Sequence, residues 1–266
     1  MRTEKNAERR FLYMFFFYFD ILVCMNLNVK FELNKELDKK MAFKFLLSSK
    51  VGGGDFSIGV TRPHPELLGI KEKDKKEATE LINEYFDKYY ENNVEILEKE
   101  KKELKEKWSK IEGKFIIQLN KIFKNPTPPE GKYIGYLSTI DCNPRFLNDK
   151  TFQVFRHRGM PPDFMATQEI VMHEILHFFF YDYAVKKYPE IFDGLDMNKG
   201  IFWKLAELFN DVIISLPEFV ELHKITKVGV YPDHKKYVEP MKNIWNNNPD
   251  IDKWIIKAYE YLNSEK

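Results

Sequence analysis

The segment VMHEILH, residues 171–177, places two histidines and a glutamate inside an otherwise apolar stretch. Its spacing predicts a long helix that begins near Thr167. His173 and His177 are four residues apart, so they lie one turn above each other on one face of that helix. Both rings can therefore direct a nitrogen to a single metal ion at about 2.1 Å. Glu174, about 100° further round the helix, can reach a water molecule at that ion and accept its proton.

This donor set favours zinc. Imidazole and carboxylate ligands that leave a fourth position for water are typical of a catalytic zinc site. The metzincin pattern requires a glycine and a histidine where this chain has Phe180 and Tyr183, so the motif is not of that type. The two cysteines, Cys24 and Cys142, exclude a four-cysteine zinc site and fit a reducing compartment.

A second apolar helix is predicted at residues 201–215, IFWKLAELFNDVIIS. It contains Glu207 and Asp211, which lie four residues apart on one face. A buried carboxylate without a partner costs several kcal/mol, so these acids need a role. Glu207 can complete the zinc shell while Asp211 accepts a hydrogen bond from the other ring nitrogen of a zinc histidine. The rival third ligands are Glu190, Asp193 and Asp196.

An HExxH helix followed by a helix with an E-x-x-x-D pattern, here Glu207 to Asp211, resembles the gluzincin metalloproteases, the group of thermolysin. The match covers residues 133–215. The resemblance implies Glu174 as the general base and Asp211 as the partner of a ligand. It implies three zinc ligands, namely His173, His177 and Glu207.

The same resemblance has two further implications. Residues 151–157, TFQVFRH, would form the edge strand that pairs with an extended substrate. A residue beyond the third ligand would hydrogen-bond the oxyanion of the tetrahedral intermediate, with Tyr231 and His234 as the candidates. Arg156 and His157 are weaker candidates for this role.

The expected fold is α+β and zincin-like: a small mixed sheet with an edge strand packed on the HExxH helix, and a mainly helical remainder. Alternating or apolar runs predict the strands, at residues 28–33, 133–140 and 151–157. Helical spacing predicts a helix at residues 35–47 and two helices within residues 71–123 that meet near Asn92-Asn93. The prolines at 126, 128 and 129 end this helical region. Gly52-Gly53-Gly54 is read as a flexible turn, because no phosphate-loop motif follows.

Residues 26–266 are expected to form one zincin-like metallopeptidase domain, with a helical region at 71–124 and a catalytic core at 130–240. Residues 1–25 contain an apolar run that lacks a small-residue cleavage site and is shorter than a membrane span. Three interpretations stay open: a start at Met25, a signal or membrane anchor, or a helix packed on the domain.

The sequence thus predicts a zinc-dependent metallopeptidase that acts on a peptide or protein substrate. It is expected in the cytoplasm, or at a membrane or outside the cell if residues 11–25 are an anchor or signal. One alternative is a non-catalytic or degenerate peptidase-like module that binds a partner through residues 71–123. Another is a DNA-associated regulator, but 42 basic against 41 acidic residues give no support to nucleic-acid binding. His64 and His223 are expected to be structural or exposed.

Overall fold

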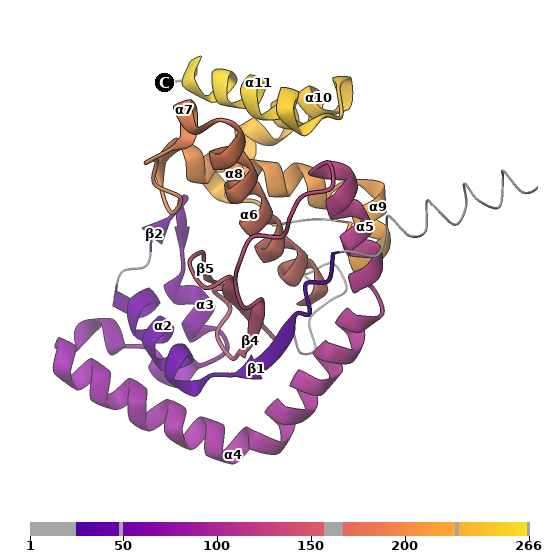
Figure 1. The fold of residues 1–266 in the computed structure, drawn as a ribbon. Helices are drawn as coiled ribbons and strands as arrows, with labels where there is room; N and C mark the ends of the chain where they lie inside the picture. The colour runs from indigo at the N-terminus through magenta and orange to yellow at the C-terminus, as the bar shows by residue number, and fades with distance from the viewer. Residues whose placement is uncertain (1–24, 48–49, 157–166, 227–228, 265–266) are drawn as a thin grey trace, which may run out of the picture.

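The computed structural model describes residues 25–47, 50–156, 167–226 and 229–264. The predictions for residues 11–24 and for His157 lie outside the described residues. The fold is α+β, as predicted, with helices on several sides of a small mixed sheet (Figure 1). In the described ranges, no helix combines the length and the apolar character that crossing a membrane requires.

Four strands form the main sheet within the described residues, in the order β1-β4-β6-β5. Strands β1, β4 and β6 are parallel, and β5 is antiparallel to β6. Their bounds are β1 Lys30–Leu33, β4 Ile134–Ser138, β5 Arg145–Phe146 and β6 Thr151–Phe155. The three longer strands therefore lie within the predicted segments.

The prediction that residues 151–157 form an edge strand is wrong. Strand β6 lies between β4 and β5, and all five of its residues are buried. Beyond the two-residue strand β5, the amide of Gln153 donates to the carbonyl of Pro144 (2.9 Å) and the amide of Phe155 donates to Asn143 Oδ1 (2.7 Å). The preceding segment thus folds back along β6 and takes the hydrogen bonds that a substrate strand would need. In a strand that is buried on both faces, the sequence is a nearly continuous apolar run rather than a strict alternation of apolar and polar residues.

Helix α2 (Lys35–Leu47) has the predicted bounds. A small hairpin follows, formed by β2 (Lys50–Val51) and β3 (Gly54–Asp55). Its two turn residues, Gly52 and Gly53, have φ values of 58° and 78°, which glycine adopts without strain. The glycine segment is therefore a tight hairpin turn.

The predicted helix junction near Asn92-Asn93 is wrong. Helix α4 (Lys75–Ser109) passes through both asparagines as one helix of 35 residues, and α5 (Glu112–Ile122) begins only after Lys110 and Ile111. An asparagine costs less than about 1 kcal/mol in a helix interior, and Asn93 Nδ2 also donates to the carbonyl of Tyr89 (2.7 Å). One buried stripe continues across the asparagines and offsets that cost, and its members are Ala78, Ile82, Phe86, Leu97, Leu104 and Trp108.

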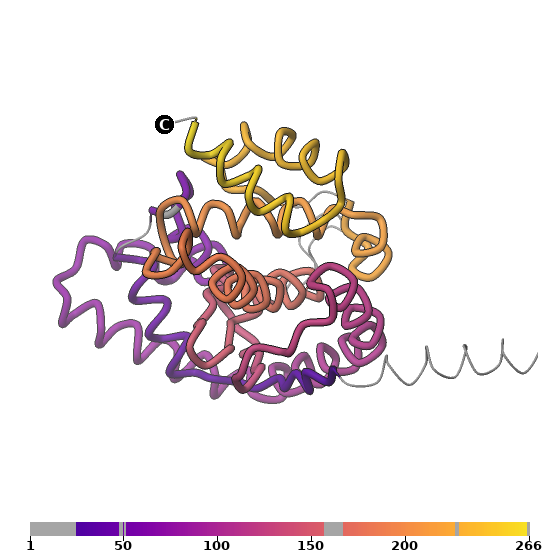
Figure 2. The backbone as a smooth tube through the Cα atoms, turned by 45° about the horizontal axis from the view of Figure 1, so that its top comes forward, coloured from indigo at the N-terminus to yellow at the C-terminus, as the bar shows by residue number. Residues whose placement is uncertain are grey.

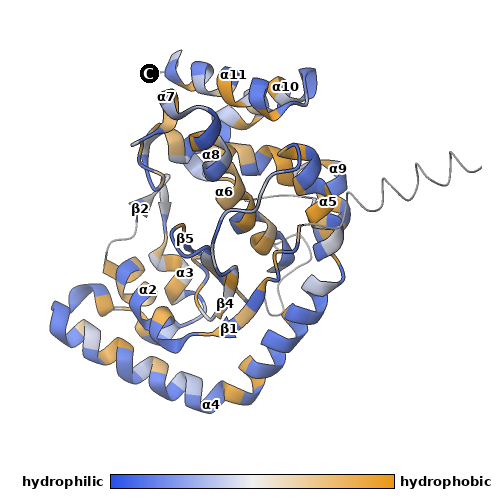
Figure 3. Cartoon of the chain, viewed as in Figure 1, coloured by the Kyte–Doolittle hydropathy of each residue, from blue (hydrophilic) through white to orange (hydrophobic). Residues whose placement is uncertain are grey.

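The opposite face of α4 is hydrophilic (Figure 3). Helix α5 ends at Ile122, before the prolines, as predicted.

The centre of the fold is the pair α6 (Thr167–Lys187) and α8 (Gly200–Ile214), which pack against each other. Helix α6 covers β6 on one side, and α10 and α11 lie on α8 at the end of the molecule far from α4 (Figures 1 and 2). The remaining helices in this half are α7 Pro189–Phe192, α9 Pro217–His223, the 3-10 turn Pro232–His234, α10 Lys235–Asn247 and α11 Ile251–Ser264.

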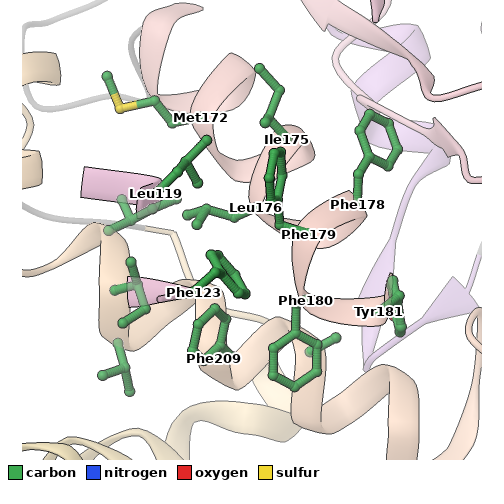
Figure 4. Packing of buried hydrophobic residues seen from close by; sticks show 14 of the residues in the cluster. Leu119, Phe123, Met172, Ile175, Leu176, Phe178, Phe179, Phe180, Tyr181 and Phe209 are labelled. Atoms are coloured by element: carbon green, nitrogen blue, oxygen red, sulfur yellow. The ribbon is translucent and has the colours of Figure 1, made fainter. Parts of the chain in front are cut away.

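Aromatic side chains fill the space behind α6 (Figure 4). The rings of Phe180 and Phe209 lie 4.6 Å apart, and those of Phe123 and Phe179 lie 5.6 Å apart. All four side chains are at most 2% exposed. This packing holds α6 against α8. It therefore fixes how the two helices are aligned along their axes, and with that which residues of one helix face which residues of the other.

A buried carboxylate ties the other side of the sheet to its helices. Asp38 of α2 is 1% exposed and accepts five hydrogen bonds, from β4, from Thr139 directly after β4, from β6 and from α4. The donors are Ser138 Oγ (2.7 Å), Gln153 Nε2 (2.6 Å), Thr139 N (2.9 Å), Thr139 Oγ1 (2.8 Å) and the Tyr90 hydroxyl (2.8 Å).

Of the two alternatives expected for His64 and His223, structural or exposed, the structure shows the first. Both rings are buried, and each places Nε2 beside a backbone carbonyl: His64 at 2.9 Å from Thr139, and His223 at 3.0 Å from Ile214.

Candidate metal centre

Helices α6 and α8 bring together the three side chains that the sequence marked as ligands. His173 Nε2 and His177 Nε2 lie 3.0 Å apart. Glu207 Oε2 lies 3.3 Å from the first nitrogen and 3.4 Å from the second. In the part of the chain that the structure describes, these are the residues whose His, Cys, Asp or Glu ligand atoms converge in a group of three.

The triangle of donor atoms fits a zinc ion. Ligand atoms at about 2.1 Å from a tetrahedral zinc lie about 3.4 Å from one another. The observed separations of 3.0, 3.3 and 3.4 Å are close to this value. Two imidazole nitrogens and a carboxylate oxygen repel one another at these distances unless a proton or a cation lies among them. The donor set can therefore hold a metal ion.

Two of the three donor groups, Glu207 and His177, are unprotonated at neutral pH, and the third, His173, carries a proton. Burial raises the pKa of the Glu207 carboxyl, but the Arg145 guanidinium and the hydrogen bond with His173 outweigh this effect and hold the pKa well below its usual value. Burial lowers the pKa of His177 to about 3, which leaves a neutral ring with a free lone pair. Burial also acts to lower the pKa of His173, but the hydrogen bond with Glu207 and the nearby carboxylates raise that pKa to about 9. A metal ion that binds here displaces this proton.

Glu174 lies beside the ligands and is 4% exposed. Burial raises the pKa of its carboxyl to about 7. Its Oε2 atom has no hydrogen-bond partner among the described residues. A carboxylate that titrates near neutral pH and has an unused oxygen can serve as a general base.

Tyr231 also reaches this centre. Burial raises the pKa of its phenol well above the usual value, and Glu207, Arg145 and Glu174 are near enough to influence that pKa. The turn of the β2–β3 hairpin packs on its ring, because a Cβ atom at Gly52 would lie 2.6 Å from Tyr231 Cδ1. The hairpin turn, which carried no functional prediction, thus holds Tyr231 in place.

His234 packs its ring against Trp203 (4.9 Å) and Tyr231 (5.4 Å) and is fully buried. Within the described part of the chain, neither of its ring nitrogens has a hydrogen-bond partner. Tyr231 is half-buried whereas His234 is fully buried, so Tyr231 is the better placed of the two sequence candidates to donate a hydrogen bond to a substrate.

No protein-family model, curated protein or solved structure matches this chain. The likeness to gluzincins therefore rests on the spacing of His173, Glu174, His177, Glu207 and Asp211 in the sequence.

Asp211 is buried near His173, but the predicted hydrogen bond to a ligand ring is not formed. Asp211 Oδ2 and the Nδ1 atoms of His173 and His177 have no partner among the residues that the structure describes. Asn210 makes the contact instead, since its Nδ2 donates to the backbone carbonyl of His173 (2.8 Å). This bond ties α8 to α6 at the level of the ligands.

The rival ligands lie elsewhere. Glu190, Asp193 and Asp196 are exposed and do not belong to the converging group. Arg156 donates to Glu100 (2.7 Å) and to the Tyr89 hydroxyl, which occupies its guanidinium.

One residue of the centre carried no signal in the sequence analysis. Arg145 of β5 donates from Nη1 to Glu207 Oε1 at 3.0 Å. It lies in a turn-rich segment 62 residues before its partner, and that distance hides the pairing from any local pattern. The available signal was Glu207 itself, because a carboxylate in an apolar helix also requires a cationic neighbour.

Proposed function

We propose that this chain is a zinc-dependent metallopeptidase that hydrolyses peptide bonds of peptide or protein substrates, with a zincin-like arrangement of its two central helices. The observation that carries the proposal is the convergence of His173 Nε2, His177 Nε2 and Glu207 Oε2 within 3.0–3.4 Å, beside the buried carboxyl of Glu174. A zinc ion at such a site acts as a Lewis acid and lowers the pKa of its water to about 7.

The residues of the chain then have distinct tasks. His173, His177 and Glu207 hold the ion from two helices. Glu174 accepts the proton of the attacking water and later delivers it to the leaving amine, a role that its raised pKa supports. The hydroxyl of Tyr231 donates a hydrogen bond to the oxyanion that develops on the scissile carbonyl.

Strand β6 does not align the substrate in this proposal, because both of its edges are paired. The strand beyond it, β5, is the outermost one on the side of the centre, and its Arg145 contacts Glu207. We infer that an extended peptide approaches the centre along β5.

Removal of the metal is expected to abolish hydrolysis. The purified protein is expected to cleave members of a fluorogenic peptide library and to lose this activity in excess chelator. Added Zn²⁺ is expected to restore the activity, because the three ligand residues stay in place without the ion. The matched control is His177→Ala, which shows no cleavage and no recovery with Zn²⁺. The proposal is contradicted if cleavage persists in excess chelator and the metal-free protein cleaves the peptides as fast as the untreated protein.

A further inference from the structure

The two carboxylate oxygens of Glu207 contact different groups. Oε2 faces both imidazole nitrogens at 3.3 and 3.4 Å, whereas Oε1 accepts a hydrogen bond from Arg145 Nη1 at 3.0 Å. The Glu207 side chain is 2% exposed and that of Arg145 is 11% exposed, so water competes little for this pair. The oxygen that faces Arg145 is therefore occupied before any ion arrives.

The guanidinium is itself held by α6 and by the segment between α7 and α8. Arg145 Nη2 donates to the Tyr181 hydroxyl (3.1 Å) and to the Met197 carbonyl (3.3 Å). The Tyr181 hydroxyl donates to the same carbonyl (2.8 Å), and its ring stacks on that of His177 at 5.8 Å. A single network thus connects a ligand histidine, the tyrosine one turn later, Arg145 and the ligand glutamate.

This geometry points to Arg145 as a positioning residue. We propose that Arg145 restricts Glu207 to metal coordination through Oε2 alone and so keeps the fourth position of the ion open for water. A carboxylate free to turn would bind the ion through both oxygens, which crowds that position and raises the coordination number from four to five when the water is also bound. The inference rests on the proposed function, since it concerns the ion that His173, His177 and Glu207 hold.

A purely structural role makes a different prediction. If Arg145 only neutralised a buried carboxylate, its loss would lower stability but leave the coordination of the bound ion unchanged. Coordination number is therefore the property to measure, and Co²⁺ in place of zinc reports it, because four-coordinate Co²⁺ absorbs visible light several-fold more strongly than five-coordinate Co²⁺.

The test compares the visible spectra of Co²⁺-loaded variants of the full chain. Arg145→Gln is expected to lose several-fold in absorbance per bound ion, because Glu207 then binds through both oxygens. Arg145→Lys, which keeps a cation near Oε1, is expected to retain most of the absorbance. Tyr181→Phe removes one hydrogen bond to Arg145 while preserving the stacked ring, so it shows a smaller loss and serves as the test if Arg145→Gln does not fold.

The matched control is Arg156→Gln, which removes an arginine of similar exposure (13%) that also pairs with a glutamate and a tyrosine, Glu100 and Tyr89, outside the metal centre. Its Co²⁺ spectrum should equal that of the wild type. Equal spectra for wild type, Arg145→Gln and Tyr181→Phe overturn the inference, and so does an equal loss in Arg156→Gln. Failure of the wild type to bind Co²⁺ instead overturns the proposed function on which the inference rests.

Discussion

Replacement of Glu174 by glutamine is expected to lower the rate of peptide hydrolysis by about 10²–10⁴-fold while one zinc ion per chain stays bound. Glutamine has nearly the same shape as glutamate but cannot accept the proton of the attacking water. The ligands are untouched, because none of the short distances among them involves Glu174. The measurement is kcat/KM on a cleaved peptide together with zinc content.

Glu169→Gln is the matched control. Glu169 lies on the same helix, is fully buried, and has a pKa that burial raises to about 7, as for Glu174. It precedes His173 by one turn and has no role in the proposed mechanism. Its variant should hydrolyse peptides within a few-fold of the wild type. Undiminished turnover in Glu174→Gln, or an equal loss in both variants, would refute the assignment of Glu174 as the base.

The second large effect is on stability. Asp38→Ala is expected to lower the free energy of unfolding by about 3–5 kcal/mol, because several buried donors then lose their acceptor at a cost of about 1–3 kcal/mol each. The donors come from β4, β6 and α4, so their loss loosens the sheet from two helices at once. Urea unfolding followed by circular dichroism measures the change.

Asp38→Asn separates the effect of the hydrogen bonds on stability from the effect of side-chain volume, because asparagine has nearly the volume of aspartate. The new amide group can face the Oδ1 side, where the Ser138 hydroxyl can turn to accept. Gln153 can also rotate its amide, since its Oε1 has no partner among the described residues. This variant should therefore lose only about 1 kcal/mol. Equal stability of wild type and Asp38→Ala would show that the network does not hold the sheet.

Local patterns predicted the parts of the fold that local physics determines. Helix α2 has the expected bounds, α6 begins at Thr167, and α8 differs from its prediction by one residue at each end. The spacing of His173 and His177 fixes their common face, and two acids in an apolar helix led to Glu207. These inferences needed only helical periodicity and the cost of burying charge.

Long-range pairing accounts for the errors. The place of β6 in the sheet depends on a return of the chain at Asn143 and Pro144 that no periodicity reveals. The continuity of α4 through Asn92-Asn93 depends on its packing against α2 and β1, which outweighs the weak helix propensity of asparagine. Arg145 was missed for the same reason, since its partner lies on another element.

Zinc content shows most directly whether His173, His177 and Glu207 form a metal site. Elemental analysis of protein purified without added zinc is predicted to find one zinc ion per chain in the wild type and in Glu190→Ala, whose side chain is exposed and outside the cluster. Glu207→Ala, which removes one of the three proposed ligands, is predicted to lose the ion or to bind it much more weakly. A wild-type protein that contains no metal and takes up none on addition of Zn²⁺ would show that these residues do not form a zinc site.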